Sequence, residues 1–255
     1  MNPFFFGESS RRLFGLYTPA RATGGKQRGI VLCHPWGQEY LRAHRSMGQL
    51  GKQLAGAGLH VLRFDYFGTG DSAGDMTQAD LKGWCSDVET AIDELKDTAS
   101  LSRVSLLGLR LGATLAAQVA ARRRKDVEAL VLWDPVVSGS EHLAELRRTD
   151  AQAVPRPEAA GGGLEVLGFP LTDALAREIE ALDLVQLAAA LPARTFAALS
   201  QALPSHAALE AAPQSGGGKL AVELIESQPA WLEDRSSGAG AVPVKVLQRI
   251  VEWLG

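Results

Sequence analysis

This chain of 255 residues is poor in the features that place a protein in a membrane or outside the cell. No stretch approaches the roughly 20 consecutive apolar residues that span a bilayer. The first residues, MNPFFFGESSRR, lack the basic start, long apolar region and small-residue cleavage site of a secretory signal. There are two cysteines, Cys33 and Cys85, which is too few for a disulfide framework, so we expect reduced, buried thiols. We therefore expect a soluble, cytoplasmic protein with no membrane span.

An excess of charge of one sign is also missing. The 26 basic and 29 acidic residues are mixed along the chain and give a formal net charge of -3. Such a balance exerts no general pull on nucleic acid or on an anionic membrane, so neither is an expected partner. The basic run at residues 122–125 (RRRK) is read as a solvated helix end, where cations suit the helix dipole.

What the chain does have is apolar residues, 46% of the total, in an alternating pattern of short and long segments. Residues 28–33, 60–65, 103–107 and 129–133 are short, apolar, β-branched runs, as buried parallel strands are. Between them, residues 46–57, 80–96 and 111–123 have the apolar periodicity or composition of helices. This order predicts an α/β protein with a doubly wound, mostly parallel sheet and helices on both faces. At this length we expect one compact domain over residues 1–255.

The regular alternation ends after Pro135. Residues 151–163 are rich in proline and glycine, and residues 171–184 then form a plausible helix. We interpret residues 138–191 as a cap or lid inserted into the sheet. Strand patterns return at 194–200 and 220–225, and a helix follows Pro243.

Three motifs occur one after another along the chain: CHPWGQEY at 33–40, VLRFDYFGTGDSAGD at 61–75, and GLRLG at 108–112. Together they resemble the α/β-hydrolase fold, in particular the serine aminopeptidase-like and monoacylglycerol-lipase-like set, with some similarity to exosortase-associated hydrolase-like proteins. The resemblance implies an oxyanion loop, a structural turn and a nucleophile elbow, in that order. It also implies that the backbone N–H groups of Trp36 and Leu111 form an oxyanion-hole-like donor pair.

The elbow, however, carries Arg110 where the family has its nucleophilic serine. A guanidinium stays protonated and has no hydroxyl or thiol with which to attack a carbonyl. The family's acid should follow the strand at 194–200 and its histidine the strand at 220–225, and neither is there. We expect His206, the last histidine in the chain, to be an exposed loop residue.

In a parallel sheet the ligand crevice lies at the carboxyl ends of the strands, so we expect His34, Asp65, Arg110 and Asp134 to line a pocket there. We expect His34 to shape its loop by hydrogen bonding. A cation at a helix N-terminus is unfavourable by about 0.3–1 kcal/mol, so Arg110 needs a partner. That partner is either internal, Asp65 or Asp134, or a carboxylate or phosphate ligand. We prefer the internal pair because an unpaired charge facing a closed pocket is costly.

The resulting hypothesis is a hydrolase-like pseudoenzyme. It would bind a small acyl or anionic molecule, or a protein partner, in the cleft that holds the active site in the family. The alternative is an active hydrolase or acyltransferase acting on esters, amides or thioesters through non-standard residues. A third hypothesis is a scaffold that uses the exposed loop at 151–163. None of them calls for a metal or another cofactor.

Overall fold

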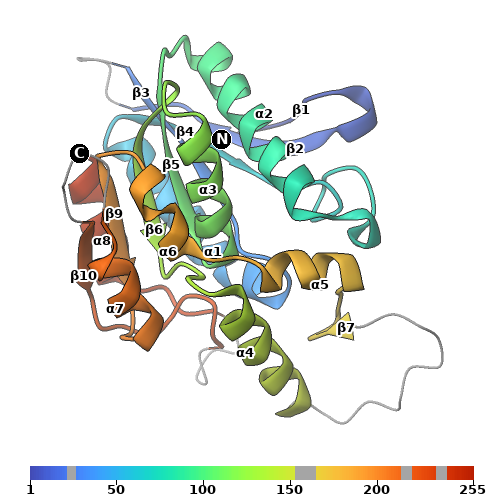
Figure 1. The fold of residues 1–255 in the computed structure, drawn as a ribbon. Coiled ribbons are helices and arrows are strands. Elements are labelled where there is room, and N and C mark those ends of the chain that lie inside the picture. Colours follow the sequence, from blue (N-terminus) through green and yellow to red (C-terminus); the bar gives the residue numbers. More distant parts are fainter. Residues whose placement is uncertain (22–26, 153–164, 214–219, 234–239) are drawn as a thin grey trace.

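The computed structural model describes residues 1–21, 27–152, 165–213, 220–233 and 240–255, which are built around one central sheet (Figure 1). In this part of the chain the sheet has eight strands in the order β1-β2-β4-β3-β5-β6-β9-β10. Their bounds are β1 Asn2–Phe6, β2 Leu13–Thr18, β3 Arg28–Cys33, β4 Leu59–Phe64, β5 Val104–Leu109, β6 Val127–Trp133, β9 Thr195–Leu199 and β10 Ala221–Leu224. From β4 to β10 all neighbours pair parallel, whereas β1 and β2 are antiparallel. The predicted doubly wound, mostly parallel sheet is confirmed.

Helices cover both faces of the sheet, and the strand residues divide between them by simple alternation. Val31 and Cys33 of β3 belong to the buried cluster under α2 (Leu81–Ala99) and α3 (Leu111–Arg122). Ile30 and Leu32 belong to the cluster under α1 (Gln38–Gly56) and α8 (Val244–Leu254). Successive side chains of a strand point to opposite faces, so a strand covered on both sides must be apolar throughout. This is why the sequence of β3 to β6 is largely apolar, with few charged residues such as Arg63 of β4.

The excursion expected over residues 138–191 holds small elements that pack beside the sheet. They are α4 (Gly139–Gln152), β7 (Glu165–Val166), β8 (Phe169–Pro170), α5 (Asp173–Glu180) and α6 (Leu184–Leu187). Leu143 of α4 and Leu175 of α5 are buried in the same apolar cluster as α2 and α3. Figure 1 shows α4 and α5 together at the lower end of the sheet, beyond the start of α3. Most of the proline- and glycine-rich stretch at 151–163 lies outside the described residues.

Three features differ from the sequence prediction. The hairpin of β1 and β2 at the sheet edge was not predicted, and α1 begins at Gln38 rather than at residue 46. Two helices were also missed, α4 and α7 (Pro204–Ala211), so His206 is not an exposed loop residue but is buried within α7, 5% exposed. Each missed helix has few buried residues, and a weak apolar stripe gives a weak sequence signal.

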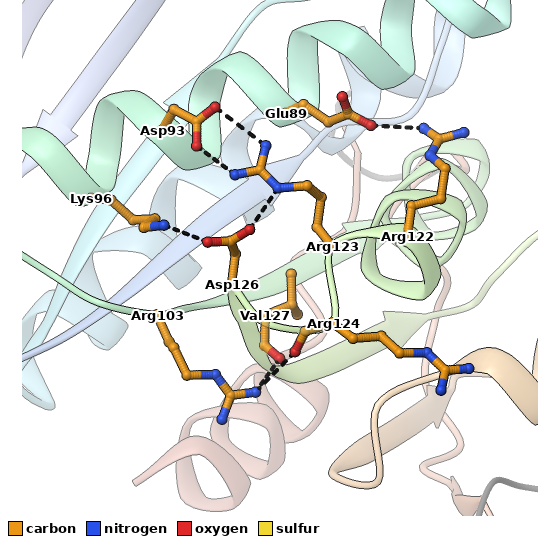
Figure 2. A network of polar contacts seen from close by, with 9 residues as sticks. All are labelled: Glu89, Asp93, Lys96, Arg103, Arg122, Arg123, Arg124, Asp126 and Val127. Atoms are coloured by element: carbon orange, nitrogen blue, oxygen red, sulfur yellow. Dashed lines mark hydrogen bonds and ion pairs between the residues drawn. The ribbon is translucent and has the colours of Figure 1, made fainter.

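The basic run at the end of α3 is more than a solvated helix end, because it pairs with α2 (Figure 2). Arg122 Nη2 lies 3.0 Å from Glu89 Oε1, and Arg123 Nη2 lies 2.6 Å from Asp93 Oδ1. Arg123 also contacts a second acid, since its Nε lies 2.7 Å from Asp126 Oδ2. The two arginines are therefore partly neutralised by acids of their own chain. No helix among the described residues is long and apolar enough to cross a membrane.

Candidate functional site

The turn from β5 into α3 has the strained geometry of a nucleophile elbow. Arg110 occupies it with φ 53° and ψ -123°, a conformation that L-residues rarely adopt. It is the N-cap of α3, and its carbonyl accepts a hydrogen bond from the Ala113 N–H at 3.0 Å. The motif therefore builds the turn that the sequence predicted, with an arginine at its centre.

The two glycines of the motif are required by close packing. A Cβ at Gly108 would lie 2.3 Å from the carbonyl oxygen of Gly112, inside the first turn of α3. A Cβ at Gly112 would lie 2.2 Å from the carbonyl oxygen of His34, in the loop after β3. Both distances are far below any tolerated contact, so only glycine lets the elbow and this loop meet.

The Arg110 side chain is buried, 3% exposed, and it is held by charged and aromatic groups from three other segments. Its Nε donates to Glu39 Oε1 of α1 at 2.9 Å, and its Nη2 donates to Glu145 Oε2 of α4 at 2.6 Å. His142 Nδ1, also on α4, lies 3.3 Å from Nη2. The guanidinium carbon lies 4.5 Å from the centre of the Trp231 ring, a cation–π distance. The elbow cation is thus enclosed by its own chain.

The internal ion pair preferred from the sequence is present, but its partners were predicted wrongly. Glu39 and Glu145 pair with Arg110, whereas Asp65 and Asp134 make other contacts. Glu39 was overlooked because α1 was expected to start later, which left this residue in a loop. Glu145 was overlooked because α4 was not predicted. The sequence offered only one signal for these two partners, namely that each is an acidic residue in a segment that follows a strand and its loop.

Electrostatics keep Arg110 charged and its histidine neighbour neutral. Burial by itself lowers the pKa of Arg110, but Glu39 and Glu145 more than offset this and raise the pKa. Burial raises the pKa of Glu39, opposed by the Arg110 charge. Burial, followed by the Arg110 charge, lowers the pKa of His142 well below its ordinary value. His142 is therefore a weak base.

A cavity of about 390 Å³ opens beside Arg110. Its walls come from the loop after β6, from α4 and from the start of α7. The apolar part of the lining consists of Pro135, Val136, Val137, Ala144, Leu203 and Pro204. The polar part consists of Arg110, Ser138, Glu141, His142, Glu145, Arg148 and Ser205. The volume is in the range of small-molecule sites in proteins.

His34 and Asp65 line a different cavity, of about 280 Å³, so the four predicted pocket residues do not share one pocket. The Asp65 carboxylate accepts hydrogen bonds from the Tyr40 hydroxyl at 2.8 Å and from the Asp71 N–H at 3.0 Å. His34 is 3% exposed, and its Nδ1 has no hydrogen-bond partner in the described part of the chain. The hydrogen bond by which His34 was expected to shape its loop is not made by Nδ1 to any described residue. Asp65 instead organises the turn after β4.

Asp134 follows β6, and both of its carboxylate oxygens accept hydrogen bonds from Ser200, which follows β9. The Ser200 N–H donates to Asp134 Oδ1, and the Ser200 hydroxyl donates to Oδ2, both at 2.6 Å. Asp134 is 1% exposed, and burial raises its pKa to about 6. Its oxygens are thus engaged by a serine that stands where the family's acid was expected.

The two donors expected to form an oxyanion-hole-like pair lie on either side of the contact between the β3 loop and α3. Leu111 is the first residue of α3, and Trp36 lies in the loop, with its indole N–H 3.2 Å from Met76 Sδ. No hydrogen bond joins the backbone N–H of Trp36 or Leu111 to another described residue. Both backbone donors remain candidates for a ligand oxygen.

The position of the histidine expected after β10 can be checked in the sequence itself. The chain contains no histidine after His206, so none follows β10. Among the described residues, no group of three or more His, Cys, Asp and Glu side chains could hold a metal ion. The arrangement places a permanent, internally paired cation beside a cavity.

Curated relatives match part of the chain. The uncharacterized protein Rv2307c of Mycobacterium tuberculosis is 32% identical over 136 residues, which are 52% of this chain and 45% of that protein. The human protein ABHD12B is 35% identical over 109 residues, which are 42% of this chain and 29% of that protein. The chain thus spans less than half the length of either relative.

Solved structures match the whole fold. Est1E from Butyrivibrio proteoclasticus, with ferulic acid bound, has a TM-score of 0.69 and 15% identity, covering 98% of this chain and 99% of that one. Mouse alpha/beta hydrolase domain-containing protein 10 has a TM-score of 0.63 and 17% identity, covering 100% of this chain and 97% of that one. At such identities the likeness shows the α/β-hydrolase fold alone. The model of the family described as serine aminopeptidase, S33, matches residues 25–186, more than half of the sequence, and so this chain belongs to that family of α/β hydrolases.

Proposed function

We propose that this protein is a non-catalytic member of its family that binds a small acyl molecule in the cavity beside Arg110. The proposal rests on the residue at the nucleophile position. Arg110 stands there, and its positive charge is paired with Glu39 and Glu145. Such a group has no electron pair for attack on a carbonyl. Because no histidine follows β10, a general base in the family's position is missing as well.

The chemistry of the cavity favours an acyl ligand over a bare anion. Its apolar wall, from Pro135–Val137 and from the start of α7, suits an aliphatic chain. Arg110 is already paired, so it has little affinity left for a free anion. Arg148 lines the cavity and is exposed, which makes it the cation available to the carboxylate or carbonyl end of the ligand.

Binding is tested by thermal shift and calorimetry with carboxylates of increasing chain length, from butyrate to decanoate. We expect the stabilisation to grow with chain length, by about 0.8 kcal/mol of binding free energy for each buried methylene group. Ala144→Phe fills the cavity from the exposed side of α4 and should abolish binding. Arg148→Gln should weaken it about tenfold, since a charge-assisted hydrogen bond is worth about 1.5 kcal/mol or more. The neighbouring Arg147→Gln is the matched control, because Arg147 is exposed but does not line the cavity.

Inactivity is tested with p-nitrophenyl esters and a fluorophosphonate probe on the purified protein. We expect neither turnover nor covalent labelling. Arg110→Ser restores the hydroxyl but not the base, so it should stay inactive too. Rapid hydrolysis by this variant, or labelling of the unaltered protein, would contradict the proposal.

One observation favours a second candidate, an active hydrolase or acyltransferase with relocated groups. Ser138, Ser205 and His142 line the same cavity as Arg110. The low pKa of His142 argues against it as a general base. A fluorophosphonate adduct mapped to Ser138 or Ser205, and lost in His142→Ala, would establish this second function. A protein partner and a cytoplasmic location stay predictions.

A further inference from the structure

A buried arginine that forms no hydrogen bond or ion pair with the described residues lies near the end of β4, against α1. Arg63, near the end of β4, is 7% exposed. No hydrogen bond or ion pair joins its guanidinium to any residue in the described part of the chain. Asp65, two residues later, directs its carboxylate to the Tyr40 hydroxyl and the Asp71 N–H instead. Burial lowers the pKa of Arg63, and its interactions with Tyr40 and Asp65 oppose this only in part. A buried cation without a direct ion pair is costly, so the arrangement calls for an anion from elsewhere.

The Arg63 side chain runs along a strip of α1 that has no side chains. A Cβ at Gly48 would lie 3.5 Å from Arg63 Nη1, and a Cβ at Gly51 would lie 3.6 Å from its Cδ. Glycine is a poor residue for a helix interior, and here two of them stand three positions apart on one face. The Arg63 side chain therefore packs close to the helix backbone, and Gly48 also lines a cavity beside it.

This cavity has a volume of about 650 Å³, and the charged residues among its described lining are all basic. Four permanent cations and one histidine border it: Arg21, Arg45, Lys52, Arg63 and His44. The other described lining residues are Met1, Gly48, Gln49 and Gln53, so no aspartate or glutamate faces it among them. Acids do lie nearby, since Asp65 and Asp71 line the 280 Å³ cavity that shares His44 and Arg63. This basic cavity stands out in a chain with a net charge of -3.

We propose that the basic cavity binds the phosphate group of a soluble small molecule, with Arg63 as its buried anchor. The planar guanidinium fork matches two phosphate oxygens, and Arg45, Lys52 and Arg21 at the rim neutralise the remaining charge. The cavity is larger than one phosphate ion needs and lies in the range of small organic ligands. The ligand class is therefore a phosphorylated organic molecule.

The neighbouring His34 reports the same positive potential. Burial first, and then the charges of Arg63 and His44, lower the pKa of His34 to about 3. An anion bound at Arg63 offsets these charges and favours protonation of His34. His34 itself lines the neighbouring 280 Å³ cavity, so it senses the anion through the charge of Arg63 and not by contact.

Pyrophosphate is the probe, titrated by isothermal calorimetry into the full chain at 50 mM and at 300 mM salt. We expect saturable binding that weakens with salt. Arg63→Gln should weaken it at least tenfold. Because a buried substitution can impair folding, the exposed pair Arg45→Gln with Lys52→Gln is made as well, and it should also weaken binding at least tenfold.

The matched control is Lys82→Gln with Arg124→Gln, an exposed lysine and arginine away from the basic cavity, which should leave the affinity within twofold. Lack of pyrophosphate binding at millimolar concentration overturns the proposal. So does an equal loss in the control pair, which would indicate general charge attraction. Vesicles containing phosphatidic acid form a separate arm, and binding to these vesicles without pyrophosphate binding would overturn the soluble ligand.

Discussion

Removing the Arg110 side chain tests whether the buried ion pair holds the elbow. Arg110→Met keeps an unbranched side chain at the strained φ of 53°, so the backbone cost of the turn is unchanged. It removes the hydrogen bonds to Glu39 and Glu145 and the contact with the Trp231 ring. Glu39 is then left 6% exposed, without its cation.

The expected loss is dominated by Glu39. Removing one partner of a buried ion pair costs about 3–5 kcal/mol, because the other charge is left without compensation. The Glu145 side chain is 37% exposed, so its share is at most about 1 kcal/mol. For a domain of this size, a total of about 3–5 kcal/mol lowers Tm by about 6–20 °C.

The assay is urea unfolding at pH 7, followed by tryptophan fluorescence, for the unaltered chain, Arg110→Met, Glu39→Met and the double variant. Replacing a buried pair by apolar side chains of similar volume is often neutral, so the double variant should be more stable than the sum of the single effects predicts. We expect a coupling free energy of about 2 kcal/mol or more.

Arg122→Met is the matched control, because its pair with Glu89 is exposed and should contribute about 0.5 kcal/mol. If Arg110→Met costs no more than this control, or if the two single effects simply add, the argument for a structural ion pair at the elbow is refuted.

Three further predictions follow from the same geometry. Because burial raises the pKa of Asp134 from 3.8 to about 6, its stabilising contribution is present below pH 3.8 and is lost as the pH rises through 6. Asp134→Asn keeps an acceptor for the Ser200 N–H and does not ionise. Its free energy of unfolding, relative to that of the unaltered chain, should therefore rise by up to about 3 kcal/mol between pH 4 and pH 7.5. Urea-unfolding stabilities of the two proteins that change in parallel with pH would count against this. Gly112→Ala should abolish soluble expression, since its Cβ would overlap a backbone carbonyl, whereas Gly56→Ala, with nothing within 4 Å, should stabilise α1 by up to about 1 kcal/mol in the same unfolding assay. Arg110→Ser should show no ester turnover above the unaltered protein, and a clear burst of product would reveal an overlooked base.

Much of the fold could be predicted because the central strands are covered on both faces. Residues 28–33 match β3, and the other buried strands were placed to within a few residues, since each is a short, largely apolar run. The hairpin of β1 and β2 lies at the edge of the sheet, and most of its residues are at least partly exposed, so this signal was missing. The elbow was also predictable, because a strand, a Gly-x-x-x-Gly turn and a helix are consecutive in sequence.

The partners of Arg110 could not be predicted, because nothing local selects them. Glu39 is 71 positions away and Glu145 is 35 positions away, on helices whose start or existence the sequence did not reveal. Asp65 and Asp134 were equally plausible candidates at strand ends. Their carboxylates were instead taken by nearer donors, Tyr40 and Ser200.

The sequence by itself determined which side chains stand at two positions: residue 110 is an arginine without a hydroxyl, and no histidine follows β10. These are facts of covalent structure that no packing can alter. Only the tertiary structure decided which acids neutralise Arg110 and that Arg63 forms no ion pair with the described residues. The physical reason is that charge compensation depends on distances of a few ångströms between side chains, and these are set by how the helices pack on the sheet.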